Sequence, residues 1–187
     1  MKRTLLLVAL LLVTPYASGF DATVQGIEAS RAEGRITITF DVANVFTEEL
    51  IEQLQSGIPI KFRHRIDAIA PKRFWLTTAN VEARTIVETR VAYDALTERY
   101  ELSRTTFHRK PDRKTSPPPL EERSFSDDFE VVRRWMTQCS DVVLFDPNKP
   151  LSPRVSKVRV ESVIGRKYVL WVFPSRVSVQ AEVMLEP

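Results

Sequence analysis

Alternation of apolar and polar side chains is the strongest pattern in this chain, and it predicts a protein built mainly from β-strands. The clearest example covers residues 58–68, where most even-numbered positions are apolar while Lys61, Arg63 and Arg65 occupy the other face. A period of two residues is typical of a strand with one buried face. A hairpin is expected next, with strands over 81–93 and 99–107.

Further strands are predicted near both ends of the chain. A weak strand interrupted by Gly26 is expected over 22–30, and a strongly alternating one over 35–43. The last third alternates over 155–164 and 177–185, with an apolar run over 168–173 between them. Turns at Gly165-Arg166 and Pro174-Ser175 are expected to separate these three segments.

Two short helices are expected between the strands. The first covers residues 47–56, with Thr47 as its N-cap and Gly57 at its stop. The second begins near Ser126, and its buried stripe is Phe125, Phe129, Val132 and Met136. Residues 108–120 hold four basic residues and four prolines, which favours a surface loop.

These elements add up to about eight strands and two short helices, most of them joined by short turns. Neighbouring strands with short connections are antiparallel. The predicted fold is therefore mainly β (α+β), a single antiparallel β-sandwich or a curled open barrel over residues 20–187.

The first 19 residues have the pattern of a secretory signal peptide. Lys2 and Arg3 precede an apolar run of nine residues, and Ala17 and Gly19 are the small residues before the expected cleavage site. Nine apolar residues are too few to span a bilayer, which takes about 20. We therefore expect an exported, periplasmic protein, with membrane association as the remaining alternative.

Removal of residues 1–19 lowers the net charge from +3 to +1, because Lys2 and Arg3 leave with no acidic residue. The basic isoelectric point is thus no argument for nucleic-acid binding, and we expect none. The remaining cations are unevenly placed, since residues 58–125 hold fourteen basic against nine acidic residues. Such a region can attract an acidic partner or anionic lipid.

Catalytic chemistry is sparse, and we expect neither an enzyme nor a cofactor or metal site. The two histidines, His64 and His108, match no metal-binding spacing, and the chain contains no phosphate loop or nucleophile elbow. His64 falls on the inward face of its strand, where a hydrogen-bonded core histidine is expected. Cys139 is the only cysteine and is expected to be buried.

The row Lys61, Arg63 and Arg65 is the best candidate for a partner-facing site. Three cations on one strand face repel one another unless something anionic lies over them. Glu82 and Glu88 on the next polar face could supply that charge internally. Alternatively, the row faces anionic lipid or an acidic partner protein.

Two segments carry a resemblance to a known family. The sequence LQSGIPIKF at 54–62 combines a helix stop with Gly-Ile-Pro and a strand, and VAYDALTERY at 91–100 forms a Tyr-Asp-x-Leu-x-x-x-Tyr hairpin. Together with the leader, they make residues 20–143 resemble the DUF4390 proteins, a bacterial family of unknown function. The resemblance implies an exported protein of the Gram-negative envelope, accessory to a sensor histidine kinase of the nitrogen-regulation type. It carries over no catalytic residue.

Three functions remain open on the sequence. The first is a periplasmic binding or scaffold module that acts by protein contact. The alternative is a lipid or envelope-ligand binding protein, with an apolar cavity lined by Phe62, Trp75, Tyr93 and Trp171. An enzyme is the third, and it would need His108, an acid and Cys139 in one tight cluster.

Signal cleavage is expected directly before Phe20, because the small residues that signal peptidase requires end at Gly19. Intact-mass spectrometry of the exported protein should give a mature chain that begins at Phe20. A mature chain that begins at Met1 would instead indicate an anchored form.

Overall fold

The computed structural model describes residues 21–71, 80–109, 117–146, 150–169 and 173–185, so the predicted signal peptide lies outside the described residues. The described elements comprise nine strands and two helices. In chain order they are β1 (Thr23–Ala32), β2 (Arg35–Ala43), α1 (Glu48–Gln55), β3 (Ile60–Ala70), β4 (Asn80–Asp94), β5 (Arg99–Arg109), β6 (Leu120–Ser126), α2 (Phe129–Thr137), β7 (Cys139–Leu144), β8 (Lys157–Val169) and β9 (Phe173–Met184).

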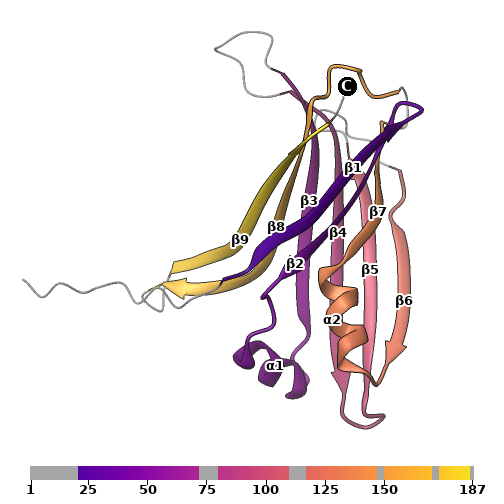
Figure 1. The fold of residues 1–187 in the computed structure, drawn as a ribbon. Coiled ribbons are helices and arrows are strands. Elements are labelled where there is room, and N and C mark those ends of the chain that lie inside the picture. Colours follow the sequence, from indigo (N-terminus) through magenta and orange to yellow (C-terminus); the bar gives the residue numbers. More distant parts are fainter. Residues whose placement is uncertain (1–20, 72–79, 110–116, 147–149, 170–172, 186–187) are drawn as a thin grey trace, which may run out of the picture.

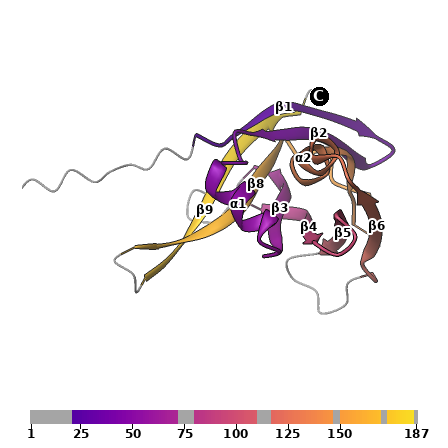
Figure 2. The same cartoon turned by 90° about the horizontal axis from the view of Figure 1, so that it is seen from below.

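The strands form two antiparallel sheets, which confirms the predicted fold class. The larger sheet has the order β6-β5-β4-β3-β8-β9, and the smaller has the order β1-β2-β7. Figures 1 and 2 show the smaller sheet lying across one face of the larger one, with α2 beside it. The other face of the six-stranded sheet, here called the outer face, is left without a covering element among the described residues.

Strand β3 lies in the interior of the larger sheet, and its alternating side chains show which face is buried and which is exposed. It pairs with β4 on one side and with β8 on the other. Its even-numbered side chains, among them Phe62 and Ile66, are buried under the smaller sheet. Lys61 and Arg63 point to the outer face and stay exposed.

Helix α1 stops at Gly57 as predicted, but Ile58 belongs to the cap of the helix and not to the next strand. Gly57 adopts φ 84°, and the amide of Ile58 donates to the carbonyl of Gln53 while that of Gly57 donates to Leu54. These two bonds form a Schellman motif. Ile58 is therefore 54% exposed, and β3 begins two residues later than predicted. The predicted N-cap is confirmed, since the Thr47 side chain accepts from the amide of Leu50.

The segment before α2 is a strand, so two predictions are corrected there. Phe125 lies in β6 and is 66% exposed, so it is not part of the helical stripe. The helix starts later because the Asp128 side chain accepts from the amide of Glu130 and caps it. The predicted loop is also shorter than 108–120, because His108 lies within β5 and Leu120 is the first residue of β6. Residues 110–116 lie outside the described part.

The last two strands are longer than expected, and both predicted turns are wrong. Gly165 lies within β8, at a bulge in the pairing with β9, so the strand bends there and continues to Val169. Pro174 pairs with Tyr168 inside β9. The strand β7 was missed altogether, because six residues that begin directly after a helix leave little alternation to detect.

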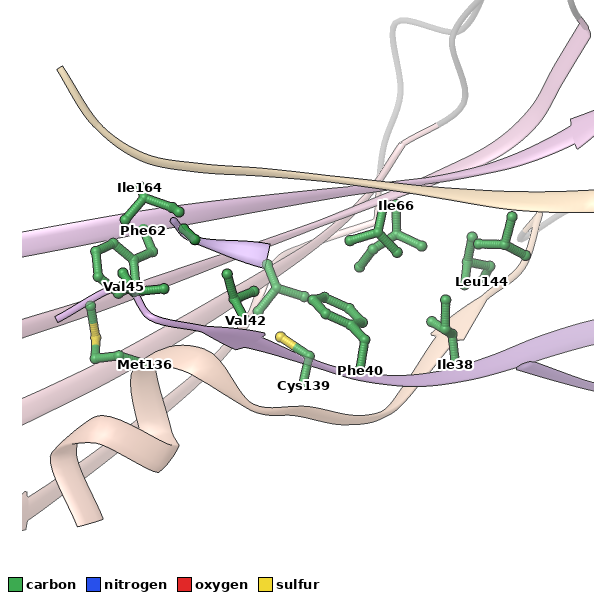
Figure 3. Packing of buried hydrophobic residues seen from close by; sticks show 14 of the residues in the cluster. Ile38, Phe40, Val42, Val45, Phe62, Ile66, Met136, Cys139, Leu144 and Ile164 are labelled. Carbon is green, nitrogen blue, oxygen red and sulfur yellow. The ribbon is translucent and has the colours of Figure 1, made fainter. Parts of the chain in front are cut away.

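A continuous hydrophobic core fills the space between the two sheets. Figure 3 shows Met136 of α2 near Phe62 of β3 at one end of this space, Leu144 of β7 at the other end, and Phe40 of β2 between them. Each of these four side chains is at most 1% exposed. The ring of Phe62 also lies 5.7 Å from that of Phe46, so the space beside it is occupied by another side chain.

A polar seam crosses this core and fastens the end of α2 to the larger sheet. His64 is fully buried, with Nδ1 2.9 Å from Ser162 Oγ and Nε2 3.3 Å from the carbonyl oxygen of Met136. Thr89 Oγ1 donates to the same carbonyl over 3.3 Å. The predicted hydrogen-bonded core histidine is thus confirmed.

Two neighbouring side chains extend the seam along the same edge of α2 and β7. Arg104 donates through one guanidinium nitrogen to the carbonyls of Trp135 (2.7 Å) and Gln138 (3.0 Å), and its plane lies over the Trp135 ring. Thr85 Oγ1 donates to the carbonyl of Val143 over 3.1 Å. The last carbonyls of a helix have no partner within it, so strand side chains satisfy them here.

The buried histidine makes stability dependent on pH. Burial lowers the pKa of His64 from its ordinary 6.5 to about 4, so the fold favours the neutral ring. Below pH 6.5 the unfolded chain binds this proton first, and stability falls as the pH approaches 4. Between pH 7.5 and 5 we expect His64 to contribute a loss of about 2 kcal/mol in the free energy of unfolding.

Urea titrations at the two pH values measure this loss. The His64→Gln variant should be less stable than wild type at pH 7.5 and should lose correspondingly less on acidification. His108→Gln is the matched control and should keep most of the wild-type dependence. Equal losses in wild type and His64→Gln would contradict the assignment.

Candidate functional site

The predicted row Lys61, Arg63 and Arg65 lies along β3 on the outer face of the six-stranded sheet. The exposed fractions of its side chains are 55%, 50% and 39%, in that order. The structure therefore places the three cations on one accessible face, as the alternation predicted. The three cations differ in the carboxylates with which they form ion pairs.

Lys61 and Arg63 share one carboxylate. Glu88 of β4 lies 2.5 Å from Lys61 Nζ and 3.5 Å from Arg63 Nε. The expected role of Glu88 is thus observed. Glu82 does not take part, because its carboxylate accepts from the amide of Ser152 over 3.0 Å.

Arg65 belongs to a second network that is partly buried. Its guanidinium pairs with Glu161 of β8 at 2.6 Å and lies 3.4 Å from Asp67. Asp67 is only 2% exposed, and Arg84 donates to both of its oxygens over 2.6 and 3.1 Å. This network joins β3, β4 and β8, so Arg65 and Arg84 stabilise the pairing of these strands.

The sheet register adds two cations that sequence reasoning missed. Lys61 of β3 stands directly opposite Arg90 of β4, and the same row continues through Ser103 of β5 to Arg123 of β6. Directly opposite residues share a face, and like charges there repel. Within the described part of the chain, neither Arg90 nor Arg123 forms an ion pair. Arg90 lies two residues after Glu88 on the same face of β4, and only the order of strands brings it beside Lys61.

We call Lys61, Arg63 and Arg90 the basic site. It holds three cations on two neighbouring strands against the single carboxylate of Glu88, and Arg90 is exposed. Exposed ion pairs contribute little to stability, so an external carboxylate or phosphate can exchange with Glu88 at small cost. The arrangement can therefore bind an anionic surface, and its charge is not needed to hold the sheet together.

His108, Cys139 and Asp141, the residue types that the enzyme alternative needs, border one groove. Burial raises the pKa of the Cys139 thiol to about 12, whereas a nucleophilic cysteine needs a lowered pKa. Nδ1 of His108 lies 3.2 Å from Thr85 Oγ1, and burial lowers the pKa of this histidine. Figure 3 shows the Cys139 sulfur directed into the core beside Val42 and Phe40.

The residues proposed to line an apolar cavity are only partly described. Phe62 is buried against Phe46, and the ring of Tyr93 lies 4.9 Å from that of Tyr100. Trp75 and Trp171 lie outside the described residues. Within the described ranges, no group of three or more His, Cys, Asp or Glu side chains is placed to hold a metal ion. No helix in those ranges is long and apolar enough to cross a membrane.

Comparison with known proteins gives one match. The family model described as "Domain of unknown function (DUF4390)" matches residues 21–163. The match reaches further than the resemblance over 20–143, because it includes the connector after β7 and half of β8. No curated protein and no solved structure matches the chain.

The two kinds of cation on the outer face should respond differently to neutralisation. Arg84→Gln removes the guanidinium that donates to both oxygens of the buried Asp67 carboxylate, and should lower the free energy of unfolding by about 2 kcal/mol or more. Arg63→Gln removes an exposed pair and should change it by about 0.5 kcal/mol or less. Urea denaturation at pH 7.5 measures both, and equal losses would contradict this division between fold and site.

Proposed function

The chain belongs to the DUF4390 family, and on that premise we propose that it is an exported, non-catalytic binding module of the bacterial envelope. It recognises an acidic surface of a partner protein through the basic site. The observation that carries the proposal is the cross-strand pair of Lys61 and Arg90. Two cations placed directly opposite each other weaken the sheet unless a bound anion offsets their repulsion.

Two cations of β8 on the outer face are less accessible than Lys61 and Arg63, which supports the basic site as the binding surface. Glu182 of β9 forms ion pairs with Lys157 Nζ and Arg159 Nε of β8, each at 2.7 Å. Hydrogen bonds from these two side chains lower the pKa of the Glu182 carboxyl. These two cations are about 70% covered, since their exposed fractions are 29% and 30%. Lys61 and Arg63 are more accessible, so a partner can reach them without rearrangement of the sheet.

The partner that the family resemblance suggests is the outer region of a sensor histidine kinase. A face built on hydrogen-bonded strands suits contact with a folded domain, because little conformational entropy is lost in ordering it. Attraction between exposed charges also speeds the encounter and makes it sensitive to salt. The protein would then act as a periplasmic accessory that senses or stabilises one state of the kinase.

The test uses the purified outer region of the sensor histidine kinase from the same organism as the probe. Wild-type protein should bind it, and the affinity should fall when the salt concentration rises from about 50 to 300 mM because the attraction is screened. The double variant Lys61→Glu with Arg90→Glu should lose at least tenfold in affinity. Its melting temperature should stay close to that of wild type, since both side chains are exposed.

A matched control reverses two adjacent exposed cations elsewhere. Arg133 and Arg134 lie on α2, away from the outer face, so Arg133→Glu with Arg134→Glu changes the net charge equally and should keep binding. Equal weakening by both double variants would mean that net charge alone drives the contact. Binding to phosphatidylglycerol vesicles but not to the kinase region would replace the protein partner with a lipid surface.

A further inference from the structure

The two edges of the six-stranded sheet are placed differently. At one edge, β9 lies beside β1 of the smaller sheet, which closes that side of the sandwich. At the other edge, β6 pairs with β5 alone among the described residues. The smaller sheet also ends in a single-sided strand there, since β7 pairs only with β2 in the described ranges. The sandwich is therefore open between β6 and β7.

A groove of about 510 Å³ lies at this open side. Its walls come from β5, β6 and β7 and include the apolar side chains Leu120, Val142, Val143 and Phe145. Arg35 lies over the Phe145 ring at 5.9 Å from its centroid. The volume falls within the range of about 300–1,000 Å³ that is usual for ligand sites.

Strand β6 is unusual in exposing large apolar side chains on both faces. Leu120 is 61% exposed on the inward face, where it borders the groove, and Phe125 is 66% exposed on the outer face. Between them, Glu121, Glu122 and Arg123 are all exposed. Charged residues protect edge strands from indiscriminate pairing, and the same charges select a partner strand that complements them.

We propose that β6 binds an extended segment of a partner protein, which adds to the six-stranded sheet as a seventh, antiparallel strand over the mouth of the groove. The segment carries apolar residues opposite Leu120 and Phe125, basic residues opposite Glu121 and Glu122, and an acidic residue opposite Arg123. The residue opposite Leu120 shares its inward face and so enters the groove. Main-chain hydrogen bonds along β6 supply the affinity and the side chains supply the selectivity.

This inference goes beyond the basic site and can fail independently of it. Its probe is the synthetic peptide Thr-Phe-Thr-Glu-Lys-Lys-Val-Thr, whose second to seventh residues face positions 125 to 120 in antiparallel order. Wild-type protein should bind the labelled peptide with a dissociation constant below about 1 mM, and a scrambled peptide of equal composition should bind at least tenfold more weakly. Lys61→Glu with Arg90→Glu should leave peptide binding unchanged.

Two alternately N-methylated peptides test the strand pairing itself. Only every second amide of an added strand faces β6. One methylated peptide should therefore lose binding at least tenfold while the other keeps it. If both keep it, the peptide binds without strand addition, and the proposal is overturned. Absence of binding by the parent peptide overturns it as well.

Variants of the protein locate the site. Leu120→Lys with Phe125→Lys should weaken the parent peptide at least tenfold. The matched control, Ile58→Lys with Leu96→Lys, changes two other exposed apolar residues, 54% and 96% exposed, and should keep wild-type binding. Thermal melts of both double variants should match wild type, since all four side chains are exposed. Equal peptide binding by the two double variants would exclude β6 as the site.

Discussion

The fold depends on how the backbone carbonyls at the end of α2 and in β7 find donors. The segment from Trp135 to Val143 lies across the larger sheet, and each free carbonyl there would be costly if buried without a partner. His64, Thr85, Thr89 and Arg104 reach it from three adjacent strands. Arg104 alone serves two of these carbonyls, those of Trp135 and Gln138, while His64 and Thr89 share the carbonyl of Met136. These hydrogen bonds hold α2 and β7 against one face of the larger sheet, so the opposite face is the outer one.

The outer face follows from that placement. The smaller sheet and both helices lie on one side, and no described element covers the polar side chains of β3, β4 and β8 on the opposite side. Ion pairs across strands stabilise the upper part of this face, around the buried Asp67. Towards the other end, Lys61 and Arg63 share the carboxylate of Glu88, and Arg90 forms no ion pair among the described residues. Arg65 and Arg84 therefore join strands through a buried carboxylate, whereas Lys61 and Arg63 pair with a single carboxylate and stay more exposed.

The open side of the sandwich has the same origin. The six-stranded sheet is wider than the three-stranded sheet, so one of its edges extends past the cover. β6 is that edge, and its side chains are exposed on both faces. The basic site and β6 share the outer row from Lys61 to Arg123, so a partner that binds at the first can extend a segment towards the second. The two surfaces differ chemically, since the basic site presents charged side chains and β6 presents an edge that pairs only with β5 among the described residues.

Local alternation determined much of this protein. It placed β2, β3 and the β4–β5 hairpin, put His64 inside and set Lys61, Arg63 and Arg65 outside, because a strand's two faces are a property of its own sequence. Caps at Thr47 and Gly57 were equally local. The pairing of Lys61 with Arg90, the burial of Asp67 and the seam under α2 could not be read in this way, since each joins residues whose neighbours depend on strand order. Phe125 was assigned to a helix because its spacing to Phe129 suits helix and strand alike. Tertiary structure decided such cases, since sheet pairing and the capping of α2 at Asp128 outweigh a weak local preference.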